Sequence, residues 1–125
     1  MGDRALIQLK CKNEVSPALY LHWEGYAVAY ILLRTKKRME GRADDLQYTF
    51  ARLVQEATMG DEGNLSFGVF NQPTELTEKD SPGDAGAFVV ELSEGRWRVK
   101  CMGGYGINKG AREAFEEAGI LVENA

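Results

Sequence analysis

The sequence is short of the side chains that most often bind metals or cross-link small domains. It contains two cysteines, Cys11 and Cys101, and one histidine, His22. Two cysteines are too few for the disulfide framework of a small secreted domain, which favours a reducing cytoplasm. Because the chain has neither a Cys-x-x-Cys segment nor a histidine pair, we expect no metal site and no cofactor.

Long apolar runs are missing as well. The longest apolar stretch, residues 26–33, is far too short to cross a bilayer. The charged start, Met-Gly-Asp-Arg, is not followed by the apolar run that is typical of a signal peptide. We therefore expect no membrane partner and a cytoplasmic location, within the host cell if a phage encodes the protein.

The net charge of −4 argues mildly against a surface that binds nucleic acid as a whole. A local basic face would still allow direct nucleic-acid binding, although the overall charge does not favour it. A length of 125 residues, with 44% apolar residues, is typical of one globular domain. We therefore treat residues 1–125 as a single domain.

Alternation of apolar and polar residues predicts the strands, and helical spacing predicts the helices. We expect strands at 4–12, 18–23 and 66–70, followed by a hairpin spanning 88–101. Helices are expected at 25–37, between Asp44 and Gly60, and at 109–118. The acidic segment 72–86, which has no apolar periodicity, is expected to be a mobile surface loop. These elements predict an α+β fold: an antiparallel sheet of about five strands, with two main helices on one face and a short C-terminal helix.

The first expected helix is apolar nearly all round, which is typical of a helix that is covered on more than one side. One stripe carries Tyr26, Tyr30 and Leu33, and another carries Ala27 and Ile31. A homodimer that buries the second stripe is one possibility. Coverage of both stripes by the sheet and the second helix is the other.

No set of catalytic residues can be recognised. A Cys–His enzyme would need Cys11 or Cys101 beside His22. Both cysteines lie on the apolar faces of their strands, where a thiol is usually an inert small hydrophobic group. We therefore expect no catalytic residue and a protein that is not an enzyme.

Basic residues alternate outward on two of the expected strands. Lys10 and Lys12 lie on the first strand, and Arg96, Arg98 and Lys100 lie on the last. If these strands are neighbours, the five cations share one face, with the aromatic side chains Tyr20 and His22 nearby. Such a face could bind phosphate groups, RNA or an acidic protein. The alternative is that these side chains are simply solvated.

A glycine-rich segment, 103–110, connects the last expected strand to the last helix. Backbone amides at such a connection can bind phosphate, and Lys109 would add positive charge. We name Gly103, Gly104, Gly106 and Lys109 as the candidate ligand-binding residues. The segment matches neither the dinucleotide fingerprint nor the P-loop pattern, so its glycines could equally serve positive backbone φ angles.

Two stretches resemble a group of small proteins of bacteria and their phages. The first is Met1-Gly2-Asp3-Arg4-Ala5 together with Ala18-Leu19-Tyr20-Leu21-His22-Trp23, and the second runs from Asp44-Asp45-Leu46-Gln47-Tyr48 to Ala51-Arg52-Leu53-Val54-Gln55. Small acidic phage proteins without an active site are often inhibitors of host defence, anti-CRISPR proteins among them. The resemblance thus implies a non-catalytic inhibitor whose partner is a host protein or nucleoprotein complex.

Three functional hypotheses follow from the sequence. The first is the phage-type inhibitor that acts by binding a host complex. The second is a small-molecule or nucleotide-binding protein that uses the 103–110 segment. The third is an enzyme that uses one of its thiols with His22.

Overall fold

The six strands form one mixed sheet in the order β3-β2-β1-β4-β5-β6. The computed structural model describes residues 2–42, 44–59 and 66–124. The strands are β1 (Ala5–Cys11), β2 (Glu14–Leu21), β3 (Phe67–Phe70), β4 (Gly86–Ser93), β5 (Arg96–Met102) and β6 (Ile120–Asn124). The helices are α1 (Val28–Arg38), α2 (Leu46–Thr58) and α3 (Lys109–Glu117), with short 3-10 turns η1 (Gly25–Ala27) and η2 (Glu78–Asp80).

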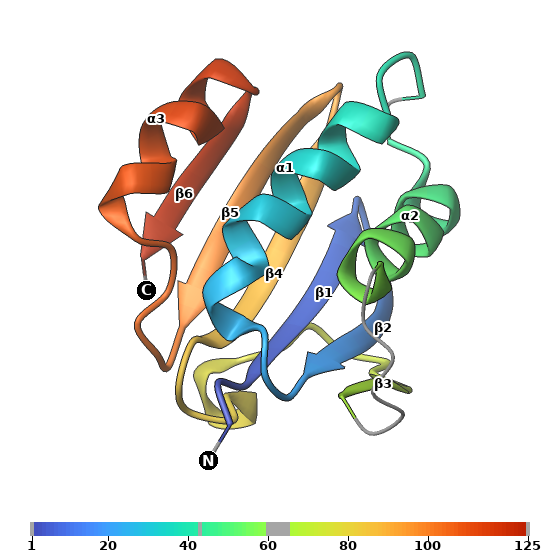
Figure 1. The fold of residues 1–125 in the computed structure, drawn as a ribbon. Helices are drawn as coiled ribbons and strands as arrows, with labels where there is room; N and C mark the ends of the chain where they lie inside the picture. The colour runs from blue at the N-terminus through green and yellow to red at the C-terminus, as the bar shows by residue number, and fades with distance from the viewer. Residues whose placement is uncertain (1, 43, 60–65, 125) are drawn as a thin grey trace.

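The α+β class is confirmed, but the expectation of a purely antiparallel sheet is wrong. β1 pairs in parallel with β4, and β5 pairs in parallel with β6. The sixth strand was not expected, because Ile120-Leu121-Val122 is too short a run to show alternation. A parallel neighbour requires a crossover, and α3 provides the crossover between β5 and β6 (Figure 1).

The main core lies between the sheet and the helices. α1 crosses the middle of the sheet, α2 lies beside it over β1 and β2, and α3 lies against β6 (Figure 1). Alternate side chains of the central strands enter this core, together with the inner faces of the helices. The largest fully buried ones are Ile7, Leu9, Leu19, Leu21, Ile31, Leu32, Leu53, Phe88, Phe115 and Ile120. Ile31 is only 1% exposed. The stripe proposed for a homodimer is therefore covered by the chain's own core.

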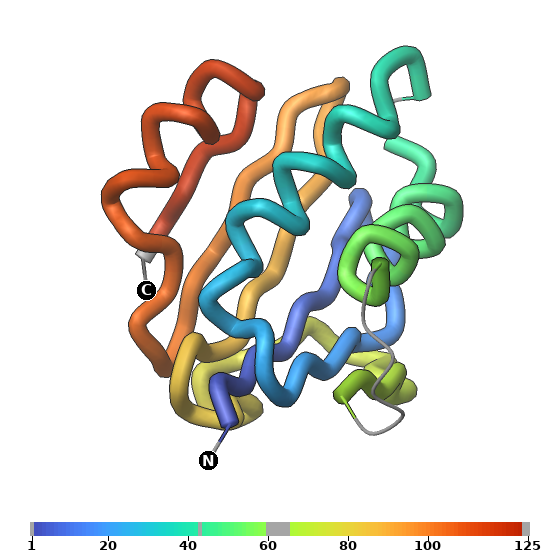
Figure 2. The backbone as a smooth tube through the Cα atoms, viewed as in Figure 1, coloured from blue at the N-terminus to red at the C-terminus, as the bar shows by residue number. Residues whose placement is uncertain are grey.

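The other side of the sheet carries a second, smaller core. Leu76, from the segment between β3 and β4, packs there with Ala87, Val89 and Met102. This segment lies behind the lower end of the strands in Figure 2. The prediction that segment 72–86 is a mobile surface loop is therefore wrong in part. Leu76 is only 2% exposed and anchors the segment to the sheet.

Asp44 and Asp45 have separate structural roles at the start of α2. The Asp45 carboxylate accepts a hydrogen bond from the backbone N–H of Tyr48 at 3.0 Å and caps the helix. The Asp44 carboxylate instead accepts bonds from the N–H groups of Glu94 and Gly95, in the turn between β4 and β5. The loop before α2 is thereby tied to the far end of the sheet.

Candidate functional site

A groove lies between α1 and α3. Its volume is about 350 Å³, and its lining includes Ala29 and Leu33 from α1, Ala111 and Ala114 from α3, and Ile107 from the loop before α3. Every residue of the lining is uncharged. Three of these residues, Ala29, Ala111 and Ala114, have small side chains, which leaves space between the two helices.

Three tyrosines stand at this groove. Tyr26 and Tyr30 come from one stripe of the first helical segment and are 71% and 65% exposed, and Tyr105, from the loop after β5, is 55% exposed. Large aromatic side chains usually bury most of their surface in a folded chain. Three of them left exposed beside one uncharged groove mark a surface suited to contact with another molecule.

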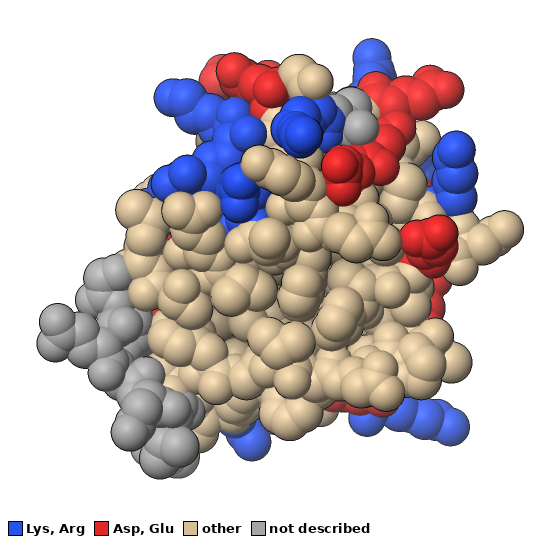
Figure 3. Space-filling view, turned by 90° about the vertical axis from the view of Figure 1, so that its right-hand side faces the viewer, with Lys and Arg blue, Asp and Glu red and all other residues tan. Residues whose placement is uncertain are grey.

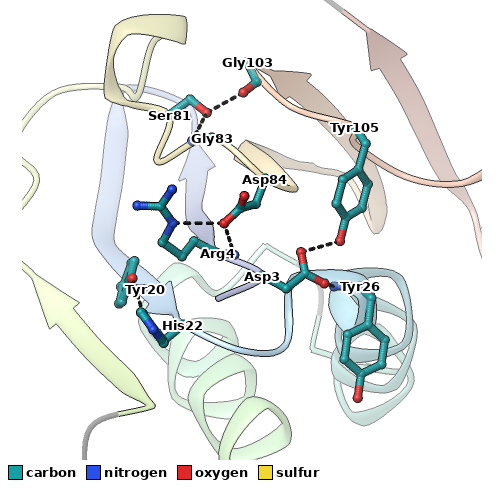
Figure 4. A network of polar contacts seen from close by, with 10 residues as sticks. All are labelled: Asp3, Arg4, Tyr20, His22, Tyr26, Ser81, Gly83, Asp84, Gly103 and Tyr105. Atoms are coloured by element: carbon teal, nitrogen blue, oxygen red, sulfur yellow. Dashed lines mark hydrogen bonds and ion pairs between the residues drawn. The ribbon is translucent and has the colours of Figure 1, made fainter. Parts of the chain in front are cut away.

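The carboxylate of Asp3 fixes the end of the groove (Figure 4). Tyr105 donates its hydroxyl hydrogen to Asp3 Oδ1 at 2.6 Å, and the backbone N–H of Tyr26 donates to Asp3 Oδ2 at 2.9 Å. Partial burial, with the hydrogen bond to Asp3, raises the pKa of the Tyr105 hydroxyl. Tyr105 therefore stays a neutral hydrogen-bond donor, and a single side chain holds the two sides of the groove together.

Beside Asp3, an ion pair joins the start of β1 to the turn before β4. Asp84 Oδ2 accepts hydrogen bonds from the backbone N–H of Arg4 at 3.0 Å and from its Nε at 2.9 Å (Figure 4). These bonds lower the pKa of the Asp84 carboxyl, and the same pairing raises the pKa of the Arg4 guanidinium. Asp84 adopts a positive φ of 51°, which an aspartate tolerates better than most residues.

The predicted glycine-rich segment borders a second pocket. A volume of about 400 Å³ is lined by Gly103, Gly104, Lys109 and Arg112, among others. Arg112 Nε is buried and has no hydrogen-bond partner among the described residues. Gly106 lines the groove between α1 and α3 instead. The segment thus separates the two pockets.

The glycines of this segment also have structural reasons to be there. Gly103 and Gly106 both have a φ of 69°, in the left-handed region that favours glycine. A Cβ on Gly104 would lie 2.4 Å from the backbone carbon of Ala85. The loop must therefore contain glycine whether or not a ligand binds.

The five cations expected on one sheet face are separated by acids. β4 lies between β1 and β5, and its Glu91 pairs with Lys10 on one side and with Arg98 on the other. The assumption that the two basic strands are neighbours is therefore wrong. Their outward placement is correct, since Arg96 and Arg98 are exposed and Lys100 is half-buried, whereas Lys12 lies in the β1–β2 turn.

Two of these cations are already paired. Lys10 Nζ lies 2.8 Å from a Glu75 carboxylate oxygen, and Arg98 Nε lies 3.3 Å from one of Glu123. Acidic residues of the 72–86 segment and of β6 are therefore interleaved with these cations. A uniformly cationic surface does not result.

His22 bonds to a tyrosine rather than to a thiol. Its Nδ1 lies 2.7 Å from the hydroxyl of Tyr20, and its ring packs edge-on against Trp23. Burial raises the pKa of both cysteine thiols, which disfavours the nucleophilic thiolate. The Cys11 sulfur lies 3.7 Å from the carbonyl oxygen of Asp44. This arrangement does not supply the thiol–imidazole pair that a cysteine enzyme needs.

The sequence reasoning missed Asp3, Tyr105 and Arg112. Tyr105 lies within the glycine-rich segment, so its aromatic side chain was a usable signal. The pairing of Asp3 with Tyr105 joins positions at opposite ends of the chain and leaves no local pattern in the sequence.

No family model matches this chain, and no curated protein or solved structure matches it. Over residues 2–42, 44–59 and 66–124, no group of three or more His, Cys, Asp or Glu side chains is placed to hold a metal ion. None of the helices in those ranges is long and apolar enough to cross a membrane. The resemblance to small bacterial and phage proteins stays a prediction from the sequence.

Proposed function

We propose that this protein acts by binding a host protein, and that the groove between α1 and α3 is where the partner docks. The observation that carries the proposal is the set of three exposed tyrosines, Tyr26, Tyr30 and Tyr105, around an uncharged lining. Tyrosine is enriched at protein interfaces because its ring buries a large apolar area while its hydroxyl can still form hydrogen bonds.

The dimensions of the groove favour a protein segment over a small ligand. A volume of about 350 Å³ is near the lower limit for ligand pockets, which usually enclose most of their ligand. Here the tyrosine rings stand in solvent rather than closing over the cavity. The matching partner is a segment that inserts an apolar or aromatic side chain between the two helices and packs its flanks on the rings.

The resemblance to small phage proteins is what favours a host protein or nucleoprotein complex as the partner, and inhibition as the outcome. Binding without catalysis is further supported by the placement of His22 away from a reactive thiol. An inhibitor needs only to occupy its partner's surface. A rigid groove held by Asp3 is suited to that task, because little ordering is needed on docking.

The test compares two tyrosine variants. Wild-type protein, Tyr30→Ala and Tyr48→Ala are used to capture partners from bacterial lysate, and affinities for the captured partner are then measured by calorimetry. Tyr48 is the control, because it lies on α2, outside the groove, with its ring between Arg42 and Arg52. We expect Tyr30→Ala to weaken binding at least about tenfold and Tyr48→Ala to leave it unchanged. Equal binding by all three proteins would rule out the groove, and capture of no partner would count against a binding role.

A second candidate function is the binding of a phosphorylated small molecule in the pocket beside Gly103 and Gly104. It is favoured by one observation, the buried Arg112 Nε without a hydrogen-bond partner in the described part of the chain. An anionic oxygen would satisfy this donor, and Lys109 at the start of α3 would add a second charge.

Thermal unfolding with inorganic phosphate and a panel of nucleotides tests this candidate. A ligand present at a hundred times its Kd stabilises the folded state by about 2.7 kcal/mol, which gives a clear rise in Tm. We expect Arg112→Gln to abolish that rise and Arg96→Gln, on the exposed sheet face, to retain it. If no compound raises the Tm of the wild-type protein, this candidate is wrong.

A further inference from the structure

Among the described residues, the strand β3 lies at one edge of the sheet and is paired along one side only, with β2 (Figure 1). The N–H of His22 donates to the carbonyl of Ser66 at 3.0 Å, so these two residues form a hydrogen-bonded antiparallel pair. Such pairs alternate along a strand. Gly68 and Phe70 therefore direct their backbone groups toward β2, while Phe67 and Val69 present theirs to the open edge.

This edge lacks the charges that usually protect an exposed strand. The stretch 66–74 contains no charged residue, although 27% of the whole chain is charged. Natural proteins commonly place lysine or another charge on an edge strand to prevent pairing with other chains. The opposite edge follows that practice, because Glu123 of β6 is paired with Arg98.

The face that includes this edge carries most of its charges at its margins (Figure 3). Figure 3 views the molecule from the side on which α2 and β3 lie in Figure 1, and the centre of that face has few charged atoms. Lys and Arg lie around its margins, most of them at the upper left, with others at the top, the upper right and the lower margin. Residues 66–74, which include β3, contribute no charged side chain to this face.

The side chains of β3 are apolar and incompletely covered. Val69 is 54% exposed and Phe70 is 52% exposed. Phe67 and Val69 lie opposite Leu21 and Leu19 of β2, so they are on the helix side of the sheet. Phe70 lies on the other side, with its ring 6.0 Å from that of Tyr20. Pairing at this edge would bury apolar area on both sides of the sheet.

We propose that a second copy of this chain docks antiparallel along β3 and continues the sheet through a two-fold axis at Gly68. In this register, Phe67 lies opposite the partner's Val69, and each such pair exchanges both of its backbone hydrogen bonds. Gly68 faces the partner's Gly68 without any side chain to clash. The aromatic and β-branched pairs on either side of the axis are of the kind that stabilises neighbouring strands.

A second copy fits this edge because the edge is complementary to itself. A two-fold interface places the same surface patch on both partners, so a charged patch would oppose its own copy. Two molecules that each carry a net charge of −4 repel one another over most of their surfaces. Residues 66–74 add no like charges of their own to such an interface, and the outward donors and acceptors of β3 are arranged symmetrically about Gly68.

Sedimentation velocity on matched edge variants tests the proposal. Val69→Lys and Leu121→Lys both place a charge on an edge strand at an apolar position of similar exposure, 54% and 52%, but at opposite edges of the sheet. From about 10 µM to about 1 mM, a range that covers moderate self-affinity, we expect wild type and Leu121→Lys to form a dimer. Val69→Lys should stay monomeric. Wild-type protein that is monomeric throughout, or a dimer that survives Val69→Lys, would overturn the proposal.

A cross-linking experiment tests the register. Facing residues of a non-hydrogen-bonded antiparallel pair have Cα atoms about 4.5 Å apart, within the range that a disulfide spans. Gly68→Cys should therefore give an intermolecular disulfide under mild oxidation, whereas Leu121→Cys and the wild type, with its own two cysteines, should not. The new Cβ would lie 3.2 Å from a ring atom of Phe70, a half-exposed side chain that can move. A dimer that does not cross-link through position 68 would disprove this register, and binding of a foreign strand without self-association would disprove the choice of occupant.

Discussion

Gln8 shows how one residue can organise a segment that is distant in sequence. Its side chain lies on the side of the sheet away from the helices and is 0% exposed. The Nε2 group donates to the carbonyls of Ser16, Gln72 and Thr74 at 3.0–3.3 Å, and Oε1 accepts from the N–H of Leu76 at 2.9 Å. Gln8 therefore supplies the hydrogen bonds that the 72–76 segment would lose on leaving water.

We expect Gln8→Ala to lower the free energy of unfolding by about 2–4 kcal/mol, because it leaves buried carbonyls and the Leu76 N–H without partners. Urea unfolding followed by circular dichroism measures the change. Gln55→Ala, the same substitution at an exposed position of α2, should change stability by less than about 0.5 kcal/mol. Similar values for the two variants would contradict the anchoring role of Gln8.

Alternation along the first strand indicates that Gln8 and Lys10 share a face, and in the structure this is the face of the sheet opposite to the helices. Alternation could not show that Gln8 is buried, because burial on that face depends on Leu76, which is separated from it by most of the chain. The prediction that the cations of β1 and β5 lie on neighbouring strands was wrong for the same reason. Their spacing depends on Glu91 of β4, and strand order is not encoded in a local pattern.

At the level of elements, helices and hairpins were predictable because their signals are local. The α2 helix starts at the Asp45 cap, and the β4–β5 hairpin turns at Glu94 and Gly95, with φ angles of 53° and 80°. β6 was missed because a short apolar run after a helix is ambiguous between a strand and a loop. Its pairing with β5 exists only because α3 returns the chain to that edge.

The prediction that the first helix is covered on more than one side is wrong in part, because the buried residues of α1 lie along one stripe. Ile31 and Leu32 enter the main core, while Tyr30 of α1 and Tyr26 of the preceding turn η1 remain exposed. The candidate groove depends on this division, since α3 approaches the tyrosine side without covering it. Only the sheet topology, with α3 beyond β5, places the second wall there.

For the whole molecule, the decisive junction is the parallel pairing of β1 with β4, which joins the antiparallel strands β3-β2-β1 to the mixed strands β4-β5-β6. The Arg4–Asp84 ion pair and the bond from the Ala85 N–H to the Arg4 carbonyl, 3.1 Å long, lie at its end. The three strands on either side are otherwise linked by neighbouring hairpins or crossovers. A substitution that weakens the β1–β4 pairing should therefore destabilise both halves of the sheet together.

The Asp84 carboxyl makes part of this junction sensitive to acid. Its pKa is lowered in the folded protein by Arg4, so its contribution to stability is present above the unfolded value of about 4 and is lost as the pH falls through the folded value. Asp84→Asn, which retains a residue suited to the positive φ, removes that dependence. We expect the fall in Tm between about pH 6 and about pH 3 to be smaller in Asp84→Asn than in the wild type. Scanning calorimetry measures the Tm of both proteins at each pH. An identical fall in both would show that Asp84 does not contribute to the acid sensitivity of the fold.

The same junction affects how the chain reaches its fold during synthesis. β1 can pair along its second edge only after β4 has been synthesised. The first half of the chain therefore leaves the ribosome with the apolar strand Ala5–Cys11 unpaired along that edge. Pairings between distant segments form slowly, because a long loop must close first. An unpaired central strand can associate with other nascent chains in that interval. We therefore expect the yield of folded protein in cells to depend on chaperone supply and translation rate more than its final stability alone would indicate.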